Sequence, residues 1–380
     1  MPLLKETGAG EKTLRVVAIG GGTGLSTLLR GLKRYVATPE RRKASGTRLD
    51  RKAHGAQDAH GPEQRGTREL GDGAELACVI RELSAVVTVT DDGGSSGRLR
   101  EDFKMLPPGD IRNCMVALSE DEHLLSKLFQ FRFDQGELQG HSFGNLFVAA
   151  LSHITGDFAQ AVQMSSQILA TRGRIFPATN TNVTLAAMMA DGSLVRGETN
   201  ITASKQSIVE LMLEPATADP LPETLAAIAN ADLITLGPGS LYTSLITNLL
   251  VRGVPEALAA SRATKVFVCN LMTQANESLG LTASQHIEKI QQHVGEAGSP
   301  IFDYALINTG PISATRLEQY AREGQQPIHA DLDAVRALGV EPVTGNFVHE
   351  GDVLRHDYDR VAERLLMLGL ERPVATLSGL

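Results

Sequence analysis

Short, continuous apolar runs are the feature that most constrains the fold of this chain. The clearest runs lie at residues 15–19, 85–90, 233–236, 265–269 and 304–308. Each of them ends in, or is soon followed by, Gly, Asp or Asn, and stretches with helical spacing, such as Leu25 to Leu32, separate the strands. Strands that are apolar throughout and alternate with helices indicate a parallel sheet covered on both faces. The sequence therefore predicts an α/β fold.

Two segments depart from this alternation. Residues 37–74 hold eight Lys or Arg, including Arg41-Arg42-Lys43, and six Gly, with almost no large aliphatic residues. Such a segment cannot bury enough surface to offset its ordering entropy, so we predict a disordered basic insertion. Residues 174–214 predict a small β-rich appendage, in which strands at 183–189 and 194–202 flank an Asp191-Gly192 turn.

Composition excludes several classes of protein. The chain has 380 residues, 42% of them hydrophobic, and a formal net charge of −8. An acidic chain with only 4% aromatic residues and no Trp is a poor candidate for binding nucleic acid or a membrane surface. The three cysteines show neither zinc-type nor CxxC spacing, and no apolar run is long enough to span a bilayer. We expect a cytoplasmic protein with reduced thiols.

A glycine turn follows the first strand. Gly20-Gly21-Gly22-Thr23-Gly24 precedes a helix, but Leu25 stands where a dinucleotide fingerprint has its third glycine, and no GK[ST] follows. Glycines let backbone amides approach a phosphate at the positive end of a helix, so the turn predicts phosphate binding. A tight turn without any ligand is the alternative.

An acidic turn follows the second strand. Asp91-Asp92-Gly93-Gly94-Ser95-Ser96-Gly97-Arg98 places two carboxylates where ligands bind in open parallel sheets. One or two carboxylates beside substrate phosphates suit Mg²⁺, and Asp110, which we predict as a helix N-cap, could add a third. The alternative is an Asp that caps the turn through its own backbone.

Further polar turns carry weaker signals. Gly237-Pro238-Gly239-Ser240 ends a strand and opens a helix, which predicts an anion site or an N-cap alone. Residues 140–144 match GxSxG, but no strand precedes them, so a hydrolase elbow is disfavoured. His141, Asn145 and Asn270 are each predicted either to contact a ligand or to serve the local backbone.

Six stretches taken together resemble the gluconeogenesis factor family, which is related to the 2-phospho-L-lactate transferases (CofD). They begin at Ile19, Val89, Pro107, Gly140, Leu236 and Cys269, and they read IGGGTGL, VTDDGGSSG, PPGDIRN, GHSFGN, LGPGSLYTS and CNLMTQ. The resemblance covers the chain from residue 14 onward, apart from the insertion. It implies one Rossmann-like three-layer domain over residues 14–380.

The resemblance also implies a function. Gluconeogenesis factors bind UDP-N-acetylglucosamine and act in cell shape and cell-wall supply on gluconeogenic carbon sources, without an assigned reaction. The transferases use a guanine nucleotide and Mg²⁺ to move a phospho-lactyl group onto a deazaflavin. Tyr320 and Arg355 stand in contexts that resemble those of the nucleotide-sugar contacts of the first group.

The predicted site gathers these residues. For the nucleotide they are Gly20, Gly21, Gly22, Thr23, Gly24, Asp91, Asp92, Gly93, Gly94, Ser95, Ser96, Arg98, Arg112, Asn113, His141, Asn145, Gly237, Pro238, Gly239, Ser240, Asn270, Tyr320 and Arg355. For Mg²⁺ they are Asp91, Asp92 and Asp110. We expect a nucleotide-sugar-binding regulator that assembles as a homodimer. The rival hypotheses are a Mg²⁺-dependent transferase and an NAD(P)-dependent dehydrogenase, and the missing third glycine disfavours the dehydrogenase.

Overall fold

The computed structural model describes residues 13–37, 79–120, 124–204, 206–275, 277–294 and 300–371. The predicted basic insertion at 37–74 lies outside these residues, apart from Ala37. No helix in the described ranges has the length and apolar character needed to cross a membrane.

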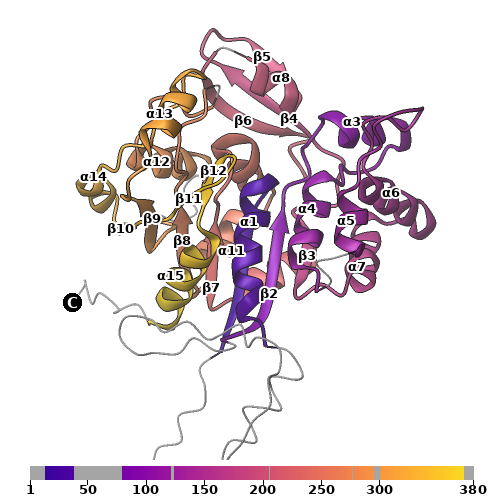
Figure 1. Cartoon of the computed structure of the whole chain (residues 1–380), viewed down its shortest axis with the longest axis horizontal. Coiled ribbons are helices and arrows are strands. Elements are labelled where there is room, and N and C mark those ends of the chain that lie inside the picture. Colours follow the sequence, from indigo (N-terminus) through magenta and orange to yellow (C-terminus); the bar gives the residue numbers. More distant parts are fainter. Residues whose placement is uncertain are drawn as a thin grey trace, which may run out of the picture.

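A seven-stranded parallel sheet forms the centre of the molecule (Figure 1). From one edge to the other its strands are β10 (Glu341–Gly345), β9 (Tyr304–Asn308), β8 (Thr264–Val268), β7 (Leu233–Leu236), β1 (Leu14–Gly20), β2 (Ile80–Val87) and β3 (Arg174–Pro177). Every neighbouring pair is parallel. Most residues of β1, β7 and β8 are buried, because helices cover both faces. The predicted α/β architecture is confirmed.

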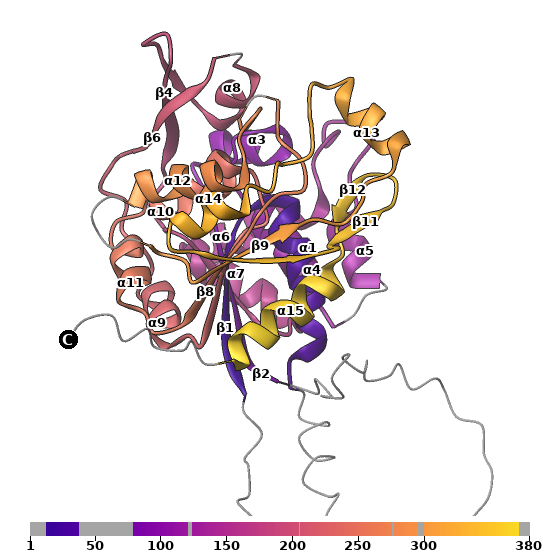
Figure 2. The same cartoon turned by 90° about the vertical axis from the view of Figure 1, so that its left-hand side faces the viewer.

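Two layers of helices enclose the sheet. On one side lie α1 (Gly22–Leu32), α4 (Gly109–Leu118) and α15 (Tyr358–Leu370), and on the other lie α9 (Pro222–Asn230) and α11 (Val254–Ala260) (Figure 2). The buried leucines of α1, including Leu25, Leu28 and Leu29, form the apolar face that the sequence predicts. The remaining described helices are η1 (Lys33–Tyr35), α3 (Gly94–Phe103), α5 (Leu124–Gln130), α6 (Phe143–Thr155), α7 (Phe158–Ile168), α8 (Glu198–Ala203), η2 (Leu241–Ile246), α10 (Thr247–Leu249), α12 (Ala283–Val294), α13 (Ala314–Ala321) and α14 (Leu332–Ala337).

The strand order reverses between β1 and β7. The chain builds outward from β1 to β2 and β3, then returns to the other side of β1 and builds outward again from β7 to β10. This is the order of a doubly wound Rossmann-like sheet, in which a crevice opens beyond the strand ends at the reversal. The glycine turns after β1 and β7 lie on the two sides of that point.

A separate three-stranded antiparallel sheet is inserted between β3 and β7. It consists of β4 (Thr184–Met189), β5 (Leu194–Arg196) and β6 (Ile208–Glu214), and the predicted Asp191-Gly192 turn joins the first two. The predicted segment 174–214 therefore divides, because β3 pairs with β2 in the main sheet. The predicted second strand over 194–202 is also too long: the chain turns at Gly197, with φ of 89°, into α8. A third, two-stranded sheet pairs β11 (Val348–Glu350) with β12 (Leu354–His356).

The helices α4 and α6 begin in different ways. Asp110 is not the N-cap of α4, because the helix begins at Gly109 after Pro108 and places Asp110 in its first turn. Ser142 caps α6 by accepting a hydrogen bond from the Asn145 amide. The residues before Gly140 form turns rather than a strand, so the geometry of a nucleophile elbow is absent there.

Candidate functional site

A cavity of about 490 Å³ lies beyond the strand ends where the sheet order reverses. Its lining comes from segments that are far apart in the sequence. The lining residues are Gly21, Gly22, Thr23, Gly24, Thr27, Asp91, Asp110, Glu198, Pro238, Gly239, Ser240, Ser244, Asn270, Leu271, Met272, Gln274, Tyr320, Gln325, Leu354, Arg355 and His356. The structure thus brings the predicted glycine turns, Asp91, Asp110, Asn270, Tyr320 and Arg355 around one space.

The start of α1 faces this cavity, and its N-cap residue, Gly21, has no side chain that could cap it. Gly21 is extended, Gly22 begins the helix with φ of 61°, and no acidic residue lies in the first turn. The Gly22 amide donates a hydrogen bond of 2.7 Å to Asp110 Oδ2. Thr23 and Gly24 line the cavity beside it. A positive helix end that borders a cavity is a binding place for an anion.

The two glycine turns of the site are locked against each other. A side chain on Gly24 would collide with the Pro238 carbonyl, so only glycine permits this approach. Asn270, which follows β8, holds the glycine turn after β7 in place. Its Nδ2 donates to Gly239 O at 2.7 Å, and its Oδ1 accepts from Gly239 N at 3.3 Å. Asn270 therefore lines the cavity and serves the backbone at once.

The turn after β7, predicted as an anion site or as an N-cap alone, has a carboxyl group of the protein itself at the helix start that follows it. Glu277 Oε2 accepts hydrogen bonds from the amides of Tyr242 (3.1 Å) and Thr243 (3.4 Å), and its Oε1 accepts from the Thr243 hydroxyl at 2.9 Å. The protein's own carboxylate therefore occupies the positive start of the π-helical segment η2. Burial raises the pKa of Glu277, and these hydrogen bonds oppose that shift. At the start of α1, the Asp110 carboxyl group accepts from the Gly22 amide, so an anionic ligand still has the amides of Thr23 and Gly24 there.

Three carboxyl groups line one part of the cavity. Asp91 and Asp110 are joined there by Glu198, which comes from α8 of the small sheet. Burial and the neighbouring Asp91 carboxylate raise the pKa of Asp110 to about 6. Burial, with the charges of Asp91 and Asp110, raises the pKa of Glu198 to about 9. Burial and the mutual repulsion of neighbouring carboxyl groups therefore favour the protonated forms of Asp110 and Glu198.

Asp92, which we predicted as a ligand or metal residue, does not line the cavity. Its Oδ1 accepts from the backbone amide and the hydroxyl of Thr199, at 2.8 and 2.6 Å. Asp91 keeps one oxygen within its own turn, accepting from Gly93 N at 2.9 Å. In the described part of the chain, no three His, Cys, Asp or Glu side chains are arranged to hold a metal ion by themselves.

The donor set nevertheless suits Mg²⁺ when a phosphorylated ligand is present. Mg²⁺ is bound through one or two carboxylates plus water and substrate phosphates, rather than by an all-protein cage. Asp91 and Asp110 supply the carboxylates, and their crowding with Glu198 is what a cation would relieve.

Several predicted residues lie behind the cavity and form its supporting network. Ser95 Oγ lies 3.1 Å from His141 Nδ1 and accepts from Asn145 Nδ2 at 3.2 Å, which ties the start of α3 to the start of α6. The predicted residues that do not line the cavity are Gly20, Asp92, Gly93, Gly94, Ser95, Ser96, Arg98, Arg112, Asn113, His141, Asn145 and Gly237.

The arginines of this region also have protein partners. Arg98 donates to the carbonyl of Gln139 at 2.9 Å, and Arg112 donates to Asn113 Oδ1 at 2.8 Å. Burial lowers the pKa of Arg112, and the nearby Arg132 adds to that effect. Arg98 thus ties α3 to the turn before α6, Arg112 bonds its neighbour within α4, and neither arginine lines the cavity.

The opposite part of the cavity is closed by the C-terminal region. Tyr320 of α13 and Arg355 of β12 line it, and the Leu354 amide donates to the Tyr320 hydroxyl at 3.0 Å. His356 Nε2 lies 3.1 Å from the Cys269 carbonyl, and burial lowers the pKa of His356 to about 4. The imidazole is therefore neutral at pH 7 and donates to that carbonyl, which fixes β12 over the end of β8.

Sequence reasoning missed some of the lining. Gln274 stands in the CNLMTQ stretch and donates to Ser240 Oγ at 2.9 Å, so the motif itself could have indicated it. Glu198 had no such signal, because it was assigned to a strand. Thr27, Ser244 and Gln325 likewise carry no pattern that separates them from ordinary helix or turn residues.

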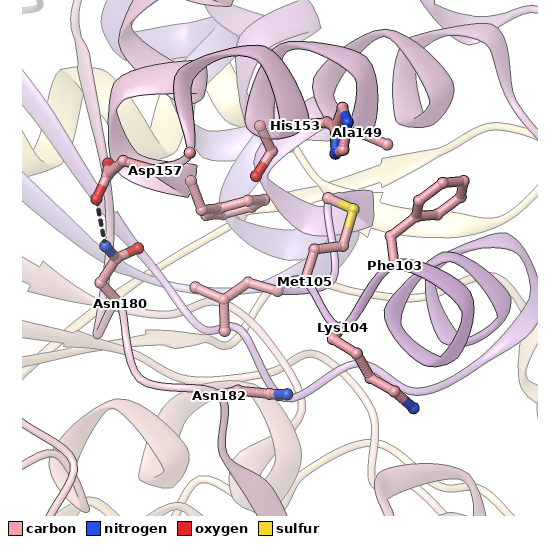
Figure 3. Close-up of a pocket in the computed structure, with 12 residues that line it drawn as sticks. Phe103, Lys104, Met105, Ala149, His153, Asp157, Asn180 and Asn182 are labelled. Atoms are coloured by element: carbon pink, nitrogen blue, oxygen red, sulfur yellow. Dashed lines mark hydrogen bonds between the residues drawn. The ribbon is translucent and has the colours of Figure 1, made fainter.

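A second cavity, of about 310 Å³, lies between the ends of α3, α6 and α7 (Figure 3). Met105 and Phe158 form part of its apolar lining, and Asn180 Nδ2 donates to Asp157 Oδ2 at 2.8 Å. Asp157 also caps α7. None of the glycine turns reaches this cavity, so it lacks the features that point to a nucleotide.

Comparison with known proteins agrees with this architecture. The family model described as 2-phospho-L-lactate transferase CofD matches residues 16–348. The "Gluconeogenesis factor" of Halalkalibacterium halodurans is 42% identical over 93% of this chain and 96% of its own length. That of Bacillus subtilis is 41% identical over 93% of this chain and 98% of its own. The crystal structure of a UPF0052 family member from Bacillus halodurans matches with a TM-score of 0.79 and 42% identity, covering 93% of this chain and 99% of that one.

Proposed function

Because this chain belongs to the 2-phospho-L-lactate transferase CofD family, and because its relatives include gluconeogenesis factors, we propose that it binds UDP-N-acetylglucosamine and regulates cell shape and cell-wall supply during growth on gluconeogenic carbon sources. One observation carries the proposal. The glycine-rich start of α1 shares a cavity with Tyr320 and Arg355, which the fold brings from the other end of the chain.

The cavity offers a place for each part of such a ligand. A diphosphate fits the start of α1, where the Thr23 and Gly24 segment presents backbone to the cavity. Arg355 supplies a guanidinium, whose donors match phosphate oxygens. Tyr320 supplies a ring and a hydroxyl beside it, and Leu271 and Met272 add an apolar surface for a base.

Calorimetric titration of the purified protein with UDP-N-acetylglucosamine tests the binding. Arg355→Ala should weaken the affinity about tenfold or more, because a hydrogen bond to a charged group contributes about 1.5–3 kcal/mol. Arg322→Ala is the matched control, since Arg322 is exposed at the end of α13 and does not line the cavity. No binding by the wild type at millimolar ligand would overturn the proposal.

The cellular role needs a separate measurement. A strain without this protein should lose its normal shape on a gluconeogenic carbon source and recover it with the wild-type gene. Arg355→Ala should restore shape poorly, whereas Arg322→Ala should restore it fully. Full rescue by Arg355→Ala, at equal protein level, would separate the cellular role from the cavity.

The carboxyl groups favour a second candidate, a Mg²⁺-dependent transferase of the phospho-lactate type. Asp91 and Asp110 would hold the ion, which would neutralise charge on the transferring phosphoryl group. The chain's own part would be to position donor and acceptor within the cavity. Mass spectrometry after incubation with a guanosine-diphospho-lactate donor and a deazaflavin acceptor distinguishes the transferase from the regulator. A transferase forms a detectable product, whereas donor binding without product favours the regulator.

A further inference from the structure

We infer that Glu198 gives this site its preference for a nucleotide sugar over the bare nucleotide, and that Asp92 and Thr199 hold Glu198 in position. The inference rests on the proposed function, because it takes a nucleotide diphosphate to lie in the cavity. It assigns to the small sheet, β4 to β6, the part of the site that contacts the sugar.

The order of the lining residues determines which part of the ligand meets Glu198. β12 and α13, which carry Arg355 and Tyr320, lie on one side of α1, whereas α3 and α4 lie on the other (Figure 1). Asp91 and Asp110, which precede α3 and begin α4, line the cavity together with Glu198. A ligand with its nucleoside beside Tyr320 and its diphosphate over the start of α1 therefore extends its sugar toward Glu198.

Glu198 has the chemistry to contact sugar hydroxyls. Thr90 Oγ1 donates to Glu198 Oε2 at 3.3 Å, which orients the carboxyl group. Its Oε1 has no hydrogen bond to any residue that the structure describes, and the side chain is only partly buried at the cavity wall. A carboxyl oxygen in this place can accept a hydrogen bond from a hydroxyl or an N-acetyl N–H group.

Asp92 places Glu198 through its contacts with the next residue. Asp92 Oδ1 accepts both the amide and the hydroxyl of Thr199, at 2.8 and 2.6 Å. Gly197, on the other side of Glu198, adopts φ of 89°, and a side chain there would lie 2.6 Å from Asp92 Oδ2. Asp92, in the acidic turn after β2, thus contacts the residues on both sides of Glu198 at the start of α8. Asp92 and Thr199 are positioning residues.

Paired titrations with UDP and UDP-N-acetylglucosamine test the assignment. Glu198→Ala should weaken binding of the sugar nucleotide about tenfold and change UDP affinity by less than about twofold, because only the sugar contact is lost. Glu210→Ala is the matched control, an exposed carboxylate on β6 of the same small sheet. Equal loss of both ligands, or no loss of either, overturns the inference.

Thr199 gives the test of positioning. Thr199→Val removes the hydroxyl that donates a hydrogen bond to Asp92, so it should lower the ratio of sugar-nucleotide affinity to UDP affinity. Thr199→Ser keeps a hydroxyl and should have the wild-type ratio. A purely structural role would instead shift the thermal midpoint and weaken both ligands alike, which counts against positioning. If the wild type binds UDP without preferring the sugar nucleotide, this inference fails alone; if it binds neither, the proposed function fails with it.

Discussion

At the scale of single residues, the glycines of the site matter for the space that they leave. Gly24 lies against the Pro238 carbonyl, and Gly97 lies against the Asp92 carbonyl, so that neither position has room for a side chain. The sequence predicted Gly24 as part of a phosphate-binding turn and Gly97 as part of the acidic turn after β2. The structure adds that Gly24 permits two loops from different halves of the sheet to touch, and that this contact shapes the cavity.

Gly24→Ala should therefore cost stability as well as binding. Forcing a methyl group into closed backbone contact costs about 1–3 kcal/mol, and the displaced turn would no longer present the start of α1 correctly. Urea denaturation measures the loss. Gly351→Ala is the control, because a methyl group there would meet its nearest neighbour at an ordinary 3.5 Å. Equal midpoints for the two variants would show that the turns separate at little cost.

Asp110 should make the stability of the ligand-free protein depend on pH. Its pKa is raised from the ordinary value of 3.8 to about 6, so the folded state favours the protonated form. The stability that this group contributes is complete below pH 4 and is lost as the pH rises through 6. Asp110→Asn removes the titration while keeping an oxygen for the Gly22 amide.

A pKa difference of about two units corresponds to a gain from Asp110→Asn of about 3 kcal/mol at pH 8, which falls close to zero at pH 4. Thermal unfolding of wild type and variant across this range measures it, without ligand or divalent cation. A gain that is equal at both pH values would place the effect in packing rather than in the carboxylate charge.

At the scale of elements, the start of η2 depends on a carboxylate from a different segment. Glu277 lies between β8 and α12 and satisfies two amides and one hydroxyl of η2. Glu277→Ala would leave those buried donors without a partner, which costs about 1–3 kcal/mol. Denaturant unfolding should show this loss, while Glu288→Ala, an exposed change on α12, should stay within about 0.5 kcal/mol of wild type.

The elements also differ in how well the sequence predicts them. The strands β1, β7, β8 and β9 are largely apolar, with Arg15 and Lys265 as exceptions, because most of their residues are buried on both faces, and this pattern is visible without a structure. The short α8 has no such pattern, since only Ile201 is fully buried within it. Its six residues followed a strand without an obvious break, and Gly197 was the one local sign of a turn.

At the scale of the whole molecule, the site is assembled from three regions that the sequence does not connect. The parallel sheet brings the glycine turns together at its order reversal, which the alternation of strands and helices predicts. The contribution of α8 depends on the contact between Asp92 and Thr199, which are 107 positions apart. The sequence motif predicts that Asp92 lies at a strand end where ligands bind, but only the packed fold reveals its hydrogen-bond partner, Thr199.

Ligand binding should therefore protect all three regions at once. Hydrogen–deuterium exchange with saturating UDP-N-acetylglucosamine should slow at the start of α1, in α8, and in the segment of β12 that carries Arg355, because the ligand bridges them. At a ligand concentration 100 times the dissociation constant, the folded state gains about 2.7 kcal/mol, so the thermal midpoint should rise as well. UDP alone should protect α1 and β12 but leave α8 exchanging as in the free protein. Protection of α8 by UDP would show that the small sheet responds to the nucleotide rather than to the sugar.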